Sequence, residues 1–72
     1  MKNYVIKAVE EYEEALGRLK PAEREAIIAR VEMGYTYEEL AQALGKPSAE
    51  AARKAARRAL LRLAEEMHRA AG

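Results

Sequence analysis

The stretch TYEELAQALGKPSAEAARKAARR, residues 36–58, decides the fold. It begins with Thr36 and has Glu39 three residues later, a capping box that predicts a helix over residues 37–44. Gly45 follows this helix directly and can adopt the positive φ that a tight turn requires. The first half of the stretch therefore predicts a short, firmly capped helix that ends in a turn.

A second helix is predicted immediately after that turn. Ser48 is a suitable cap, and apolar residues recur at helical spacing beyond it, so the predicted helix spans residues 49–70. Ala41, four residues before Gly45, is small enough to let two helices pack closely. Two separately capped helices joined by so short a turn indicate a helix-turn-helix.

The predicted helix 49–70 has one apolar side and one basic side. Its expected inward positions are Ala52, Ala56, Ala59, Leu60, Leu63 and Met67. Its opposite side carries Glu50, Lys54, Arg57 and Leu61, with Arg53 and Arg58 on the flanks. Alanines over the first two turns are expected to hold this helix close to helix 37–44, while the long basic side chains reach outwards.

The net charge of +1 conceals an uneven distribution of charge along the chain. Residues 1–44 carry nine acidic and six basic side chains, a balance of −3, whereas residues 45–72 carry three acidic and seven basic ones, a balance of +4. Between Arg53 and Arg62 there are five basic residues and no acidic one. The helix dipole favours acidic residues near a helix start, so it does not explain this cluster. One basic face on a nearly neutral chain is typical of a protein that meets a polyanion with that face.

Two further helices are predicted before the helix-turn-helix. The first spans residues 3–18 and has Asn3 as its cap. Its apolar stripe consists of Val5, Ala8, Val9, Tyr12, Ala15, Leu16 and Leu19. The second spans residues 21–33, from Pro21 in its first turn to a stop at Gly34. Its buried side is expected to consist of Ala26, Ile27, Ile28 and Val31.

Length and composition limit the fold and exclude several kinds of site. A chain of 72 residues makes one domain, residues 1–72, and its wealth of Ala, Leu, Glu, Arg and Lys favours a compact all-α fold of four helices. Without cysteine, and with His68 as the single histidine, we expect no metal site and no cofactor. Ser48 is explained as a cap, Glu65, Glu66 and His68 are expected to be solvated, and no catalytic arrangement remains, so we expect no enzyme. No apolar run could span a bilayer and no signal peptide opens the chain, so a cytoplasmic location is expected.

Four motifs follow one another in a fixed order. They are Leu-x-Pro-x-Glu-Arg-Glu at residues 19–25, Gly-Tyr-Thr-Tyr-Glu-Glu-Leu-Ala at 34–41, Leu-Gly at 44–45 and Arg-Ala-Leu-x-Arg-Leu at 58–63. Each motif is common alone, but the ordered set resembles region 4 of bacterial sigma-70 family RNA polymerase sigma factors, especially the extracytoplasmic-function type. Two features depart from that family: the turn is one residue longer, and alanines replace the valine or leucine that often lines the last helix.

The resemblance implies a function in transcription initiation. In such a domain the helix that follows Ser48 reads the major groove of the −35 promoter element, and the first helices meet the flap of the RNA polymerase β subunit. Anti-sigma factors often cover these surfaces. Nothing in the sequence corresponds to the region that recognises the −10 element, so we expect an excised domain or a small stand-alone relative, acting as a monomer and without a membrane partner.

A set of residues around the turn is expected to bind DNA. The candidates for base edges are Glu50 and either Lys54 or Arg57, because a carboxylate accepts from the cytosine amine and a cation donates to guanine. Phosphate contacts position a protein without specifying sequence. The residues expected to make them are Arg53, Arg58, Thr36 and Lys46.

Two other functions fit the same sequence. A stand-alone regulator that dimerises on palindromic DNA would use the outward-pointing Leu61 as part of its dimer interface. A protein-interaction module would instead use the basic helix to meet an acidic partner. The state of association in solution separates the first alternative from a monomeric domain, and the salt dependence of duplex binding separates the second.

Overall fold

Helices make up the architecture in the computed structural model, which describes the backbone of residues 2–71 and the side chains of residues 4–70. In chain order the elements are α1 (Lys2–Gly17), α2 (Pro21–Ile27), η1 (Ile28–Glu32), α3 (Tyr37–Leu44) and α4 (Ala49–Ala71). No strand occurs in residues 2–71, and the predicted all-α fold of four helices is confirmed. No helix in this part of the chain combines the length and the apolar character needed to cross a membrane.

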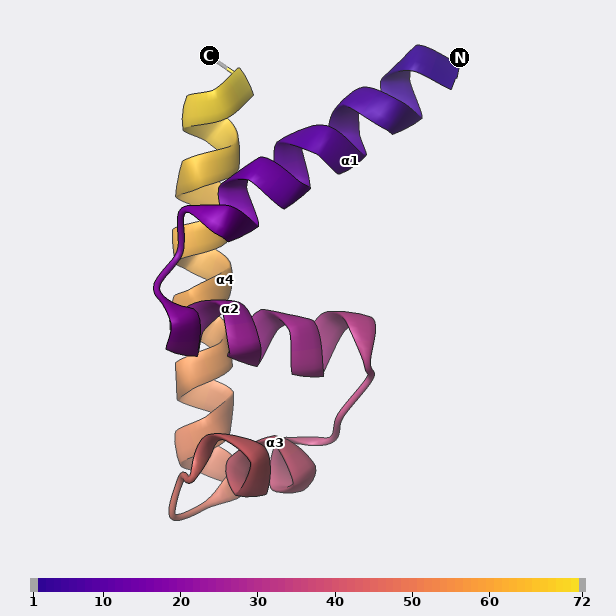
Figure 1. Cartoon of the computed structure of the whole chain (residues 1–72). Helices are drawn as coiled ribbons and strands as arrows, with labels where there is room; N and C mark the ends of the chain where they lie inside the picture. The colour runs from indigo at the N-terminus through magenta and orange to yellow at the C-terminus, as the bar shows by residue number, and fades with distance from the viewer. Residues whose placement is uncertain (1, 72) are drawn as a thin grey trace.

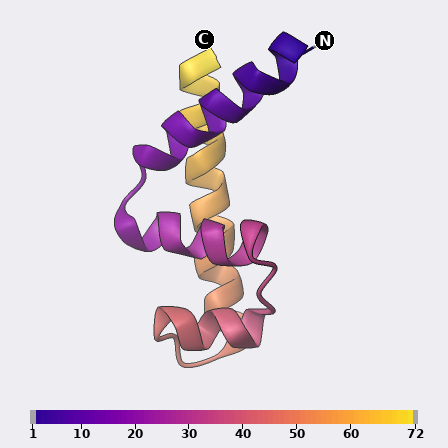
Figure 2. The ribbon, with the colours of Figure 1, turned by 45° about the vertical axis from the view of Figure 1, so that its right-hand side comes forward.

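The longest helix, α4, is the spine of the molecule (Figure 1). The other helices pack across it at successive levels, with α3 beside its first turns, α2 beside its middle and α1 nearer its end. The view turned by 45° keeps this order (Figure 2). A rise of about 1.5 Å per residue makes a helix of 23 residues about 34 Å long, which accounts for most of the 41 Å long axis of the molecule.

Two clusters of buried side chains hold the other elements on α4. The first joins α1 and α2 to the middle of α4 and consists of Ala15, Leu16, Leu19, Ala26, Ile27, Ala59 and Leu63. The second joins η1 and α3 to the start of α4 and consists of Ala29, Leu40, Ala41, Ala52 and Ala56. Leu44 packs against both clusters and connects them. Because most of these residues are alanine, the helices can approach closely.

The predicted caps of α3 are both present. Thr36 Oγ1 accepts a hydrogen bond from the Glu39 N–H at 3.1 Å, and the Thr36 N–H donates to Glu39 Oε1 at 2.8 Å. Gly45 has a φ of 68°, and the Lys46 N–H donates to the Ala41 carbonyl at 2.7 Å, which closes the helix in a Schellman motif. The predicted bounds of α3, residues 37–44, are therefore confirmed.

The start of α4 is also confirmed, and one of its predicted inward positions is wrong. The Ser48 hydroxyl accepts from the Ala51 N–H at 3.1 Å, and the helix ends at Ala71, one residue beyond the prediction. Leu60 was expected to face inwards, but it is 41% exposed. It lies on the flank of α4, because the buried side of the helix is centred on Ala59 and Leu63.

The second predicted helix, residues 21–33, starts at Pro21 as expected but changes its winding after Ile27. The Met33 N–H donates to the Ile28 carbonyl at 2.9 Å, five residues back, as in a π-helix. A wider turn rotates each successive side chain by a smaller angle. Val31, expected to be buried at ordinary helical spacing, is consequently 54% exposed.

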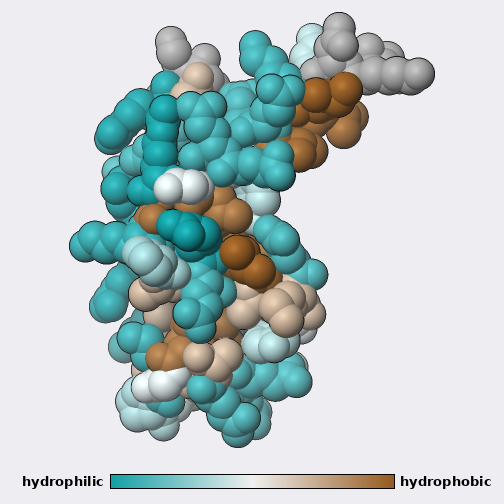
Figure 3. Space-filling model, viewed as in Figure 1, coloured by the Kyte–Doolittle hydropathy of each residue, from teal (hydrophilic) through white to brown (hydrophobic). Residues whose placement is uncertain are grey.

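Only half of the apolar stripe of α1 is buried. The helix runs from Lys2 to Gly17, one residue ahead of the prediction at both ends, and the predicted cap of Asn3 involves a side chain outside the described residues. Val5 is 65% and Val9 49% exposed, although both were expected in the core. The reason is that α1 and α4 diverge towards their free ends (Figures 1 and 2), which leaves apolar surface on α1 beside the N-terminus (Figure 3).

A hydrogen bond ties α1 to η1. The Tyr12 hydroxyl donates to Glu32 Oε2 at 2.7 Å, and the ring packs against the first core cluster. Burial, and then the neighbouring Glu32 carboxylate, raise the pKa of Tyr12 to about 12. Because the protonated phenol is the form that makes this bond, the contact is complete below pH 10, the usual pKa of tyrosine. It is lost only as the pH rises towards 12.

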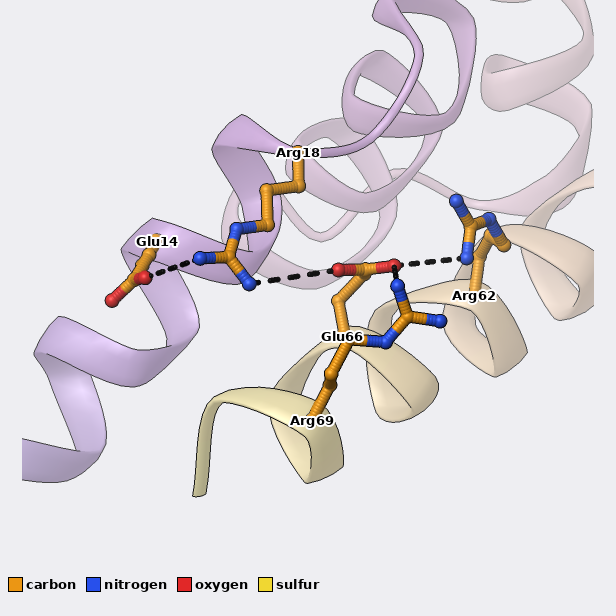
Figure 4. A network of polar contacts seen from close by, with 5 residues as sticks. All are labelled: Glu14, Arg18, Arg62, Glu66 and Arg69. Carbon is orange, nitrogen blue, oxygen red and sulfur yellow. Dashed lines mark hydrogen bonds and ion pairs between the residues drawn. The ribbon is translucent and has the colours of Figure 1, made fainter. Parts of the chain in front are cut away.

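Glu66 corrects a further expectation, because its side chain is buried rather than solvated. It is 4% exposed and lies on the same face of α4 as Ala59 and Leu63. Three guanidinium groups surround its carboxylate (Figure 4): Arg62 at 3.0 Å, Arg69 at 3.7 Å and, from the turn directly after α1, Arg18 at 3.9 Å. Arg18 also pairs with Glu14 at 2.7 Å, so the network links α1 to the last turns of α4.

Replacing Glu66 with Gln is expected to lower the free energy of unfolding by about 1–3 kcal/mol, because hydrogen bonds to a charged group are lost where water cannot replace them. Urea denaturation followed by circular dichroism measures the change. The neighbouring Glu65→Gln, at an exposed position, should alter stability by less than about 0.5 kcal/mol. Equal effects of the two substitutions would show that the network contributes nothing.

Replacing the fully buried Ala52 with Leu is expected to destabilise the fold by about 1–3 kcal/mol, because the larger side chain would separate α3 from α4. The matched control is Ala64→Leu, the same change at an exposed position of α4. Thermal unfolding of both variants provides the comparison. Wild-type stability of Ala52→Leu would contradict the close helix contact.

Candidate nucleic-acid interface

The predicted DNA-binding residues gather around the turn and the first half of α4. Thr36 caps the start of α3, and Lys46 lies in the turn. The others follow one another along α4 and are Glu50, Arg53, Lys54, Arg57 and Arg58. Their side chains are exposed, except for that of Arg53, which is half-buried. The structure thus brings the predicted set to one end of the molecule, the lower end in Figure 1.

Four cations of this set form no ion pair among the described side chains, residues 4–70: Lys46 in the turn, and three that lie together on α4. The three on α4 are Lys54, Arg57 and Arg58. They lie within two turns of the same helix, and no acidic residue separates them. Positive charges held close together and unpaired repel one another, and an approaching polyanion relieves that repulsion. This patch gives the site a positive surface for a polyanion.

Glu50 and Arg53 are already engaged with each other. Arg53 donates to both carboxylate oxygens of Glu50, at 2.7 and 2.8 Å, in a bidentate pair one turn apart on α4. The hydrogen bond from Arg53 lowers the pKa of Glu50, and the same bond raises the pKa of Arg53. Both groups are therefore charged at neutral pH, and Glu50 fixes the direction in which the guanidinium of Arg53 points.

Beside this pair lies a hollow with arginines from two elements, which we call the arginine hollow. Its volume is about 350 Å³, and its lining residues are Arg30, Tyr37, Arg53, Ala56, Arg57, Leu60 and Leu61. Its lining combines three arginines with one tyrosine and three aliphatic side chains. Among the side chains of residues 4–70, Glu50 is the only carboxylate paired to these arginines, so the hollow keeps a positive balance.

Arg30 is a residue of this site that the sequence did not reveal. Its Nη1 donates to the Tyr35 carbonyl at 2.6 Å, and its guanidinium carbon lies 4.2 Å from the centre of the Tyr37 ring, a cation–π contact. These contacts depend on the π-helical winding of η1 and on the path of residues 33–36. No spacing rule for an ordinary helix could have placed Arg30 beside α4.

The opposite flank of α4 has a different electrostatic character. There Lys46 and Arg58 line a hollow of about 330 Å³ between α2, α3 and α4, together with the carboxylates Glu23 and Glu25. Acidic groups near these two cations weaken their attraction for an anion. Of the two flanks, the one with the arginine hollow is the more suitable for a phosphate.

Thr36 has less to offer a ligand than expected. Its N–H is donated to Glu39, and its hydroxyl oxygen accepts from the Glu39 amide, so only the hydroxyl proton remains free for a phosphate oxygen. The nearby Glu39 carboxylate adds negative charge to this position. The start of α4 has dimensions that suit DNA. An α-helix is about 10–12 Å across and the major groove of B-DNA is about 12 Å wide, so a helix of this size fits the groove.

Comparison with known proteins agrees with this geometry. The family model described as Sigma-70, region 4 matches residues 9–63, which contain both core clusters, the helix-turn-helix and the whole predicted DNA-binding set. No curated protein and no solved structure matched the chain. The family is one of DNA-binding regulatory domains and not a known enzyme family. Because the match extends over well more than half of the sequence, the chain belongs to the sigma-70 region 4 family and has a DNA-binding role in transcription.

Proposed function

We propose that this domain recognises the −35 promoter element, with the first half of α4 in the major groove. The observation that carries the proposal is the patch of unpaired cations, Lys54, Arg57 and Arg58, on the exposed side of the second helix of a helix-turn-helix. DNA-binding helices of this kind contact base edges with their N-terminal residues. The patch occupies that part of α4.

The proposed contacts divide into two kinds. Glu50, Lys54 and Arg57 point away from the core. Glu50, as an acceptor from cytosine, and either Lys54 or Arg57, as a donor to guanine, are assigned to base edges. The residues assigned to phosphates are Arg53, Arg58, Thr36 and Lys46. The bidentate pair supports a second use of Glu50, since it holds the guanidinium of Arg53 in place before DNA arrives.

The proposed protein partner is the flap of the RNA polymerase β subunit. Val31 and Met33 are apolar, exposed and within the segment that the family model matches. Val31 lies in η1, whose π-helical winding turns it out of the core, and Met33 directly follows that element. Apolar side chains displayed in this way provide a contact surface for the flap.

The remaining expectations complete the proposal. The domain is of the extracytoplasmic-function type, one copy binds one −35 element, and it acts in the cytoplasm, where the chromosome is transcribed. An anti-sigma factor would inhibit it by covering the α4 patch or the flap surface. The order of motifs from residue 19 to residue 63 supports the assignment to the extracytoplasmic-function type.

Replacing Arg57 with Ala is expected to weaken binding to a −35 duplex by about 1–3 kcal/mol and to relax the preference at one base pair. The measurement is fluorescence anisotropy with a duplex selected by the wild-type domain and with a random duplex. Lys20→Ala removes the same charge from an exposed position between α1 and α2 and should change affinity little. Equal losses of Arg57→Ala on both duplexes would make Arg57 a phosphate contact.

Replacing Val31 with Asp is expected to weaken binding to RNA polymerase core at least about fivefold, because a charge would enter an apolar contact. Val31 is exposed, so the fold should tolerate the change. Leu61→Asp, a similar change on α4, serves as the control. Unchanged polymerase affinity of Val31→Asp, measured by light-scattering titration, would rule out this surface.

A further inference from the structure

Arg30 carries a positive charge for which the described side chains provide no counterion. It is half-buried, and its guanidinium forms no ion pair with a carboxylate among residues 4–70. One of its five N–H groups donates to the Tyr35 carbonyl, and the other four have no hydrogen-bond acceptor within the same residues. Because a charge partly removed from water is costly without a partner, a bound anion would stabilise this guanidinium.

The guanidinium of Arg30 is held in place by protein contacts alone. Its carbon lies 4.2 Å from the centre of the Tyr37 ring, and its Nη1 donates to the Tyr35 carbonyl at 2.6 Å. The Tyr35 N–H donates in turn to the Ala29 carbonyl at 3.0 Å, so both backbone polar groups of Tyr35 are bound to η1. A donor that is already ordered loses little conformational freedom when a ligand binds, which favours affinity.

Two arginines of α4 line the same hollow as Arg30. Arg53 and Arg57 lie one turn apart on α4, whereas Arg30 belongs to η1, so the arginine hollow has cations from two elements. Arg53 donates to Glu50 from Nε and Nη2, which leaves its Nη1 without a partner among the described side chains. Three guanidinium groups and one paired carboxylate leave a balance of +2 within residues 4–70. That balance exceeds the single negative charge of a phosphodiester.

The other side chains of the hollow suit the sugar beside a phosphate. Ala56, Leu60 and Leu61 contribute aliphatic surface, and the two leucines are 41% and 58% exposed. Deoxyribose presents C–H groups next to its phosphate, and their burial against leucine is favourable. An inorganic phosphate ion offers only oxygen atoms. Cations together with aliphatic side chains therefore favour the sugar-phosphate backbone over the free ion.

The hollow lies along one flank of the half of α4 that is proposed to enter DNA. A helix about 10–12 Å across fills a major groove about 12 Å wide, so the sugar-phosphate backbones pass along its two flanks. On the opposite flank, the carboxylates of Glu23 and Glu25 accompany Lys46 and Arg58. A backbone phosphate is therefore attracted more strongly to the flank with the arginine hollow.

We propose that the arginine hollow holds one phosphodiester of the DNA backbone, with Arg30 and Arg53 as its ligands from two sides. Arg57 adds charge at the same place, and Leu60 and Leu61 pack against the sugar. The assignment rests on the proposed function, because it requires α4 in the major groove. It extends the interface beyond the helix-turn-helix to η1, and a phosphate held between two elements fixes the position of α4 in the groove.

Replacing Arg30 with Gln tests this assignment, because the amide can still donate to the Tyr35 carbonyl but carries no charge. Fluorescence anisotropy across a salt series should show about tenfold weaker binding of a −35 duplex at low salt. The slope of log K against log salt should become shallower by about 0.9, the share of one phosphate. An unchanged slope would overturn the proposal, even if the stability of the fold changes.

Arg62→Gln is the matched control for loss of a half-buried arginine. Its partner is Glu66, near the other end of α4 from the turn. This variant should lower the free energy of unfolding and keep the salt slope of the wild type. Equal losses of slope in both variants would show a general effect of net charge and would overturn the proposal. Circular dichroism follows the fold of each variant.

A chemical change in the DNA identifies the phosphate. Each duplex of a series carries one methylphosphonate, which removes the charge of a single phosphate and keeps the bases. At one position the wild type should lose about tenfold in affinity, and Arg30→Gln and Arg53→Gln should lose almost nothing further there. Losses that add independently at every position would overturn the shared site.

Nuclear magnetic resonance of the wild-type chain gives a test that does not depend on how Arg30→Gln folds. The Arg30 Nε–H signal should shift strongly with the intact duplex and much less with the duplex that lacks the critical charge. Two other probes are inorganic phosphate alone and a polyglutamate peptide. A shift with either of them at least as large as with the duplex would assign the hollow to a free ion or an acidic partner and overturn the proposal.

These measurements separate this inference from the proposed function. A wild-type chain without measurable duplex affinity would refute both. Duplex binding that Arg57→Ala weakens and Arg30→Gln does not would refute the phosphate site in the hollow alone.

Discussion

The close contact between α3 and α4 is the constraint on which the other features depend. Ala41 of α3 meets the face of α4 that carries Ala52 and Ala56, with the fully buried Leu40 in the same cluster. Side chains this small let the two helices approach closely, and the turn at Gly45 can then be short. Once one side of α4 is closed by alanines, its long basic side chains have only the solvent side to occupy.

The spine arrangement gives the two ends of α4 different surroundings. At its start, unpaired cations and the arginine hollow make a positive surface around the turn. Near its end, the buried Glu66 gathers Arg18, Arg62 and Arg69, so arginines there serve the fold (Figure 4). Arginine content alone therefore does not locate the nucleic-acid surface. The distinction comes from which guanidinium groups have a carboxylate partner.

Local signals allowed much of the fold to be predicted from the sequence. The caps at Thr36 and Ser48 and the positive φ of Gly45 each depend on a few neighbouring residues, and all were confirmed. The errors arose where a side chain depends on distant geometry. Val31 left the core because η1 winds as a π-helix, and Val5 because α1 diverges from α4.

The candidate site shows the same division between local and distant information. Its position on α4 and the exposure of its cations followed from helical periodicity. The bidentate Glu50–Arg53 pair is a relation within one helix turn that periodicity could also have suggested. The position of Arg30 over the Tyr37 ring could not be predicted, because it depends on the π-helical winding of η1 and on the path of residues 33–36. The burial of Glu66 likewise required knowing that α1 brings Arg18 to it.

The salt dependence of duplex binding tests the central claim that the cation patch on α4 meets a polyanion. Each phosphate neutralised on B-DNA contributes about −0.9 to the slope of log K against log salt, so three contacts predict a slope of about −2.7 or steeper. Isothermal titration of the wild-type chain with a short duplex, across a series of salt concentrations, yields that slope. A slope near zero, or no measurable affinity even at low salt, would contradict the account.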